Sequence, residues 1–230
     1  MVCRSRPRVE PAGWFAAGVT LPDLRGHTRA ARLSRTALET ARPRTERERA
    51  LQAGLLEHER ADAAFHASPA FAAWRRALRP AAAALGLRGA TATLVIHVGV
   101  EVALDRCLLL DEPGLADALY AELEEVDSGD LAAALVELAG EPSRPLATTF
   151  QLFQERRHLT AWTERSRAAA SLARVCEGVL GARGRGPLPD PVALEGFLAR
   201  AEEALVGSDY APTAIAAWLG AASGESAGAA

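Results

Sequence analysis

The most apolar stretch of the chain covers residues 91–110, TATLVIHVGVEVALDRCLLL, and ionisable residues interrupt it at regular intervals. His97, Glu101 and Asp105, here called the second ladder, occupy every fourth position. Because an α-helix turns by about 100° per residue, side chains four positions apart lie one above the other on the same face. The pattern therefore predicts a largely buried helix over about residues 90–110 with one line of ionisable side chains.

Two other structures fit parts of this stretch. Val98, Val100 and Val102 alternate with other residues, which is typical of a strand, but the run far exceeds the roughly 3–10 residues of most strands. A membrane span has the right length. However, each ionisable residue costs about 2.5–3.5 kcal/mol at the bilayer centre, whereas each apolar residue contributes only about −0.3 to −0.6 kcal/mol. We therefore expect a helix inside the protein and no membrane span.

A second line of ionisable residues lies earlier in the chain. His58, Asp62 and His66, here called the first ladder, have the same four-residue spacing within LEHERADAAFHASP. A TxxE capping box begins at Thr45 and leucines recur at helical spacing after it. These signals predict a helix over about residues 46–67 that carries the first ladder in its C-terminal half.

Shorter amphipathic segments make up most of the remaining chain. An apolar segment at residues 13–20 leads into LPDLRGH, where Pro22 and Gly26 predict a turn that contains Asp23. Caps and breaker residues then predict further helices at about residues 28–41, 69–78, 113–126, 129–139, 146–158, 160–180, 191–206 and 212–221.

These elements predict an all-α protein, a single-domain helical bundle over residues 13–222 built around the buried helix at about 90–110. The composition agrees, because 49% of the residues are hydrophobic, only 5% are aromatic, and Ala and Leu are abundant. Residues 1–12 are rich in Arg and Pro, and residues 223–230 consist mostly of Gly, Ser and Ala. We expect both of these terminal segments to be disordered.

Charge and cysteine content exclude some classes of function. The net charge of −3 gives no reason to expect nucleic-acid binding, although all 26 basic residues are arginines. The three cysteines are scattered without CxxC spacing, which favours a reducing compartment and a cytoplasmic protein. The sequence contains no GxGxxG motif and no Walker-type loop, and no GxSxG nucleophile elbow accompanies the histidines.

The two ladders are the strongest candidates for chemistry. Burying a charge without a partner costs several kcal/mol, so each ladder needs an opposing polar group, a metal ion or water. His and carboxylate side chains on facing helices commonly bind metal ions in helical proteins. The expected ligands are His58, Asp62, His97, Glu101 and Asp23. The expected catalytic residues are Asp62 and Glu101, and His66, Asp105 and Arg156 are expected to orient the ligands or contact the substrate.

Each of these residues also has a structural explanation. A lone histidine is more often a hydrogen-bonded structural residue than a ligand, and Asp23 fits an Asx-type turn after Pro22. Arg156 and Arg157 precede His158 near a predicted helix end, where His158 would complement the helix dipole. The alternative is that these arginines bind a phosphate group.

Three segments carry short motifs that a known family shares: LPDLRG, GLLEHERADAAFHASPAF and LVIHVGVEVALDRCLL. They resemble the signature segments of the acyl carrier protein phosphodiesterase family, helical relatives of the HD-domain hydrolases. Asp23 matches the Asp of the family's G-N-L-x-x-D-like segment, and His58 and Asp62 match its H-x-x-x-D pair. The resemblance implies an HD-domain-like fold and a metal-dependent phosphohydrolase that removes phosphopantetheine from acyl carrier protein, with manganese or magnesium.

The chain departs from the family pattern at the positions that carry chemistry. His66 and His97 stand where acids are usual, Ser68 and Val102 replace histidines, and Glu101 keeps an acid with one more methylene group. The family's N-F-L-A-H-like N-terminal segment has no counterpart upstream of residue 13. Exchanging oxygen ligands for imidazoles favours zinc, iron or nickel over magnesium.

Two main hypotheses follow for the function. The first is a metal-dependent phosphodiesterase-like hydrolase that acts on a phosphopantetheine-type or other small phosphoester, with acyl carrier protein as a candidate partner. The second is a catalytically inactive helical bundle in which the ladders form a structural polar network. A pocket that binds such a ligand without turnover is a third, minor alternative.

Overall fold

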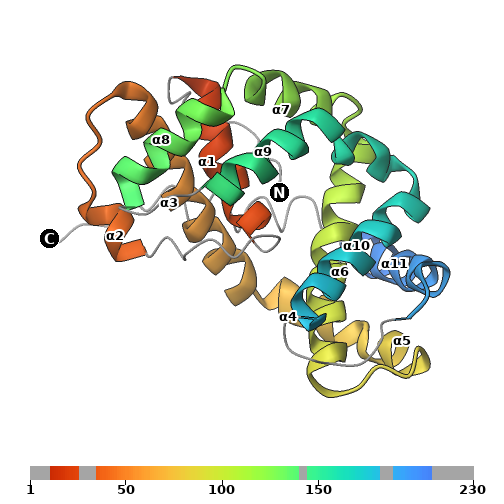
Figure 1. Ribbon diagram of the computed structural model, residues 1–230. Helices are drawn as coiled ribbons and strands as arrows, with labels where there is room; N and C mark the ends of the chain where they lie inside the picture. Colours follow the sequence, from red (N-terminus) through yellow and green to blue (C-terminus); the bar gives the residue numbers. More distant parts are fainter. Residues whose placement is uncertain (1–10, 26–34, 140–143, 182–188, 209–230) are drawn as a thin grey trace, which may run out of the picture.

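The computed structural model describes residues 11–25, 35–139, 144–181 and 189–208, and this part of the chain is helical and contains no strand (Figure 1). The predicted all-α class is confirmed. The helices are α1 (Ala12–Arg25), α2 (Arg35–Thr40), α3 (Glu46–Ala67), α4 (Pro69–Ala77), α5 (Arg79–Ala84), α6 (Gly89–Asp111), α7 (Leu115–Leu123), α8 (Ser128–Ala139), α9 (Arg144–Arg156), the 3-10 helix η1 (His158–Thr163), α10 (Arg165–Gly181) and α11 (Pro191–Val206).

The two long helices that carry the ladders form as the sequence predicts. Thr45 caps α3 by accepting a hydrogen bond from the Glu48 amide (3.1 Å), and α6 extends the predicted helix by one residue at each end. Ser68 ends α3 and caps α4 by accepting a hydrogen bond from the Phe71 amide (3.1 Å). None of the described helices is long and apolar enough to cross a membrane.

The predicted turn around Asp23 is wrong, because α1 continues through Pro22 to its end at Arg25. Proline lacks an N–H and leaves the carbonyl group of Gly18 without its helical partner. The helix persists because Leu21 and Leu24 are both buried in the core. Burial of two leucines outweighs one hydrogen bond, since each contributes about 1.5–3 kcal/mol when fully buried and a net hydrogen bond contributes about 1 kcal/mol.

Other differences concern the ends of elements. The predicted helix at 160–180 is divided into the 3-10 helix η1, which begins at His158, and α10. The predicted helix at 28–41 is described only from α2 onward. The predicted helix at 212–221, residues 1–10 and 223–230 of the segments predicted to be disordered, and His27 of the LPDLRGH segment lie outside the described residues. Residue 12, the last of the N-terminal segment predicted to be disordered, is instead the first residue of α1.

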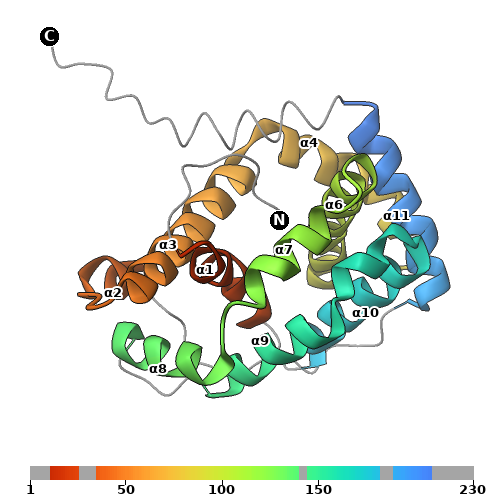
Figure 2. The same ribbon diagram turned by 90° about the horizontal axis from the view of Figure 1, so that it is seen from above.

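The apolar side chains form two clusters, and α3 and α6 contribute to both. One cluster joins α4, α5, α6, α10 and α11 with Phe65 of α3. The other joins α1, α2, α3, α7, α8 and α9 with Leu109 of α6. Figures 1 and 2 show α2, α3 and α8 on one side of the molecule and α6, α10 and α11 on the other. The ladders therefore lie on the helices that connect the two clusters.

Glycines allow two close helix contacts that position the ladder helices. A Cβ at Gly54 of α3 would lie 2.9 Å from the Cα of Gly18 in α1 and would collide with the Phe15 carbonyl oxygen. A Cβ at Gly99 of α6 would lie 2.5 Å from the Phe197 ring of α11. The α1–α3 contact brings residue 58, one turn after Gly54, against the backbone of α1.

Candidate metal centre

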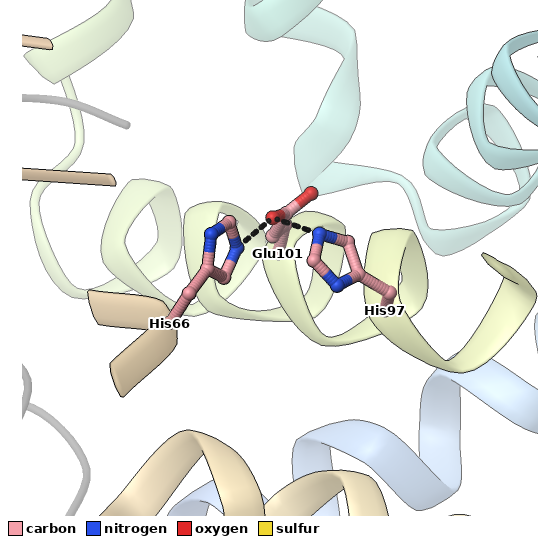
Figure 3. Close-up of side chains that lie close together, drawn as sticks. All are labelled: His66, His97 and Glu101. Atoms are coloured by element: carbon pink, nitrogen blue, oxygen red, sulfur yellow. Dashed lines mark hydrogen bonds and ion pairs between the residues drawn. The ribbon is translucent and has the colours of Figure 1, made fainter. Parts of the chain in front are cut away.

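Three side chains from the two ladders converge on one point. Oε1 of Glu101 lies 2.8 Å from Nε2 of His66 and 3.1 Å from Nε2 of His97 (Figure 3). Helix α3 supplies His66, and α6 supplies both His97 and Glu101, one turn apart. Within the described residues this triad is the one group of at least three His, Cys, Asp or Glu side chains whose donor atoms could hold a metal ion, all within 4.8 Å of one another.

Two further residues hold the imidazole rings in place. Oδ2 of Asp62 lies 3.2 Å from Nδ1 of His66, on the side of the ring opposite Glu101. The Phe71 ring packs against both imidazoles, with centroid distances of 4.7 Å to His66 and 5.2 Å to His97. The His66 ring is therefore fixed by a carboxylate at each nitrogen and by an aromatic face.

The hydrogen bonds determine the charge of the triad without a metal. Both nitrogens of His66 face carboxylate acceptors, so both must donate, and bonds to Asp62 and Glu101 raise the pKa of His66 to about 9. Burial alone would raise the pKa of Glu101, but hydrogen bonds from His66 and His97 lower it to about 2. At neutral pH the metal-free triad is thus an imidazolium bound to a carboxylate.

We expect the metal-free protein to lose stability as the pH rises through about 9. The folded-state pKa of His66 lies above its ordinary value of 6.5, so its contribution to stability is complete below about pH 6.5 and is lost as the pH rises through about 9. The loss should be about 2 kcal/mol, less than the full 1.36 kcal/mol per pKa unit because the side chain is partly exposed. Urea unfolding in the presence of a chelator measures it.

The His66→Gln variant is the matched control for this pH dependence. It removes the titrating group, so its unfolding free energy should change less than that of the original chain between pH 6.5 and 9. Equal pH dependence in the two proteins would contradict the assignment.

The donor set fits a divalent transition-metal ion. Two imidazoles and one carboxylate match the His₂Glu ligand set of several catalytic zinc sites. Ligand atoms around zinc lie about 3.4 Å apart, so the atoms now 2.8 and 3.1 Å apart need only a small separation. A metal ion would replace the protons at Nε2 of both histidines, and Asp62 would still accept the Nδ1–H of His66.

The other expected ligands lie elsewhere. Nδ1 of His58 donates to the Val19 carbonyl oxygen (2.8 Å), because a carbonyl can only accept, and its Nε2 lies 3.7 Å from Oδ1 of Asp23. Asp62 contacts His66 and does not share the point where the triad converges. The sequence pattern predicts that His66 orients the ligands or contacts the substrate, whereas the geometry makes His66 one of the three candidate ligands.

A large cavity of about 1280 Å³ adjoins the triad and collects most of the remaining candidates. Of the triad, its lining includes Glu101 but neither His66 nor His97. It also includes the expected residues Asp23, His58, Asp62, Asp105 and Arg156. Burial raises the pKa of Asp105, and the neighbouring carboxylates of Asp23 and Glu101 raise it further. The acidic side of this cavity is therefore formed by α1, α3 and α6.

Two positions at which the resembled family has histidine are occupied by Ser68 and Val102 in this chain, and both have structural roles. Ser68, which replaces one of them, accepts the Phe71 amide as a helix cap, and Val102, which replaces the other, is buried. Neither supplies a donor to the triad. The ligand set that the geometry offers therefore differs from the set that the resemblance implies.

A buried ion network that the sequence pattern did not predict anchors α6. Arg106 is buried and donates to Glu202 of α11 (2.9 Å), and Arg165 of α10 also binds Glu202 (2.8 Å). Arg106 donates further to the Thr163 carbonyl oxygen (2.9 Å). The position of Arg106 within the apolar stretch indicates a buried charge that needs a partner, but the partner, Glu202, lies almost a hundred positions away in the sequence.

No protein-family model, curated protein or solved structure matches this chain. Its function is therefore inferred from the geometry of the described residues.

Proposed function

We propose that this chain binds a divalent transition-metal ion through His66, His97 and Glu101 and hydrolyses a small phosphoester in the adjacent cavity. The observation that carries the proposal is the convergence of two imidazole nitrogens and one carboxylate oxygen, where the carboxylate, that of Glu101, lines a cavity. Three protein ligands leave a coordination position open for water or substrate, which is typical of catalytic sites and not of structural ones.

The protein side chains have distinct roles in this proposal. Asp62 keeps the proton of His66 on Nδ1, which leaves Nε2 free to coordinate. Glu101 supplies the negative charge that offsets part of the charge of the ion. A bound divalent ion supplies Lewis acidity toward a phosphoryl oxygen and lowers the pKa of a coordinated water. Zinc, iron or nickel suits the imidazole donors, whereas manganese or magnesium is what the family resemblance implies.

Asp62 is the candidate proton acceptor for the attacking water, because it lines the cavity, contacts His66 through Oδ2 and has a second carboxylate oxygen. His58 lines the same cavity but lies about 12 Å from His66 along α3, so it is placed to contact the substrate and not a water held at the triad. The water oxygen would bond to phosphorus as the ester P–O bond breaks, and the proton taken by Asp62 would then pass to the departing oxygen.

Metal removal tests the proposal. The chain purified without chelator should contain about one equivalent of a transition metal, because three preformed ligands bind tightly. Chelation should lower its melting temperature, since an ion at a concentration 100 times its Kd stabilises the folded state by about 2.7 kcal/mol. Elemental analysis, thermal melts and hydrolysis of bis(4-nitrophenyl) phosphate measure these effects. Metal content below about a tenth of an equivalent after incubation with zinc, manganese and iron would refute the proposal.

A second candidate is a structural role for the triad, and one observation favours it. His66, His97 and Glu101 already satisfy one another, with an imidazolium bound to a carboxylate. A fully satisfied network of this kind can stabilise one packing arrangement of α3 against α6 without any ion. In that case chelation would leave the melting temperature unchanged, and the pH dependence of stability described above would persist in metal-supplemented buffer.

Acyl carrier protein is a candidate partner through the family resemblance alone. The cavity itself favours a small phosphoester, since its lining combines carboxylates, histidines and arginines with apolar side chains.

A further inference from the structure

The wall of the cavity formed by α9 and α10 differs in charge from the wall formed by α1, α3 and α6. Arg156, at the end of α9, and Arg167 and Arg174, on α10, all line the cavity. Positions 167, 171 and 174 lie on one face of α10, because they are four and three residues apart. This face supplies cationic groups where the ladders supply carboxylates.

Arg174 is held in place by a buried partner. Oγ of Ser171, which is only 8% exposed, accepts hydrogen bonds from Arg174 (3.0 Å) and from Nε1 of Trp162 (3.1 Å). Both Ser171 and Trp162 also line the cavity. The guanidinium of Arg174 is therefore oriented before any ligand arrives, which reduces the entropy lost on binding.

The charges of the other two arginines differ in availability. Arg167 lies 3.6 Å from Glu164, so its charge is partly offset, although both side chains are exposed. Arg156 and Arg174 make no ion pair with the described residues. Arg174 is thus the best-positioned cation, with Arg156 and Arg167 beside the same cavity.

Helix α10 packs against α6, the helix that carries Glu101. Cys176 of α10 is buried, and this burial raises the pKa of its thiol to about 12, with a further contribution from the Glu101 carboxylate. Arg174 lies two positions earlier and therefore on another face of α10, where its side chain lines the cavity. The arginine wall and the triad are therefore connected through α10 and α6.

Much of the cavity surface beyond the arginines is apolar. The volume of about 1280 Å³ exceeds the roughly 300–1000 Å³ of common small-molecule sites and is far larger than a phosphate ion requires. The apolar lining includes Phe15, Val98, Leu119, Leu152, Val175 and Val179. Leu152 is 38% exposed, although leucine favours burial, which suits contact with an apolar group of a ligand.

We propose that Arg174, fixed by Ser171, and the neighbouring Arg156 and Arg167 form a binding site for the phosphate group of an organic phosphoester whose apolar chain fills the rest of the cavity. This inference rests on the proposed function and names its substrate class. Guanidinium groups recognise phosphate by paired charge-assisted hydrogen bonds, and the apolar chain gains from leaving water.

Binding of n-hexyl phosphate to the full chain in chelator tests the inference separately from metal binding. Calorimetry gives the affinity, and the tryptophan fluorescence of the chain should change because Trp162 lines the cavity. We expect n-hexyl phosphate to bind more tightly than either n-hexanol or inorganic phosphate. Arg174→Gln should weaken binding about 10-fold or more, and Arg174→Lys should lose less because it keeps the charge.

The control variant is Arg200→Gln, an exposed arginine of α11 that pairs with Glu203 and does not line the cavity. Its affinity should equal that of the original chain, and thermal melts should show that Arg174→Gln is folded, because residue 174 is exposed. Equal affinity of the Arg174→Gln and Arg200→Gln variants would overturn the phosphate site. Equal affinity for hexyl phosphate and inorganic phosphate would overturn the apolar part.

The two proposals fail separately in this design. If the chain takes up no metal but binds hexyl phosphate in a way that depends on Arg174, the proposed ligand class is supported and the proposed hydrolase function is refuted. If the chain takes up metal but its affinity for hexyl phosphate does not depend on Arg174, the metal site is supported and the arginine site is refuted.

Discussion

The Glu101→Gln variant is expected to lose metal binding and hydrolytic activity together. The amide keeps the shape of the side chain but removes the charge and the anionic donor at the point where His66 and His97 converge. Loss of partners outside the ligand shell costs about 10–100-fold in metal affinity, so loss of a ligand should cost about 100-fold or more. Zinc titration and the bis(4-nitrophenyl) phosphate assay measure both quantities.

An exposed glutamate of α10 supplies the control for this variant. Glu177→Gln makes the same chemical change outside the cavity lining and should retain full metal affinity and activity. Similar metal affinity in Glu101→Gln and Glu177→Gln would exclude the triad as the metal site. Activity that survives the loss of metal would exclude a metal-dependent reaction.

The Glu202→Ala variant is expected to lower the free energy of unfolding by about 3–5 kcal/mol. Glu202 is the shared partner of Arg106 and Arg165, and the side chains of Arg106 and Glu202 are only 9% and 11% exposed. The substitution leaves the Arg106 guanidinium in the core without its carboxylate, and an unpaired buried charge is costly. Urea unfolding monitored by circular dichroism measures the change.

The adjacent position provides a matched control. Glu203 pairs with Arg200 at the surface, where both side chains are more than 60% exposed, so Glu203→Ala should cost less than about 1 kcal/mol. The double variant Arg106→Leu with Glu202→Leu should recover much of the stability lost in Glu202→Ala, because neither charge then remains buried. Equal losses in Glu202→Ala and Glu203→Ala would show that the network does not stabilise the fold.

Local signals predicted the helices well because the information lies within a few neighbouring residues. The cap at Thr45, the Ser68–Pro69 pair and the length of the apolar stretch at 91–110 each act through contacts inside one segment. The error at Asp23 arose for the opposite reason. A Pro-Asp pair signals a turn locally, but burial of Leu21 and Leu24 against other helices extends α1 through it.

Which residues form the triad depends on contacts between two helices, and residue spacing within one helix does not determine those contacts. The four-residue ladders correctly place His97 beside Glu101, since both lie on α6. Which residue of α3 meets them depends on how far α3 slides along α6 and how it rotates. Packing brings His66 to Glu101 and turns His58 toward Val19 of α1, where Gly18 and Gly54 let the helices approach.

The sequence by itself determined the all-α class, the two ladder helices and the residue types available for a site, because periodicity, capping and side-chain chemistry are local properties. Tertiary structure alone decided that His66 joins His97 and Glu101, that Glu202 neutralises Arg106, and that the arginines of α9 and α10 line the same cavity as the carboxylates of α1, α3 and α6. Each of these pairs segments far apart in the chain, and only the packing of side chains in the two cores sets their relative positions.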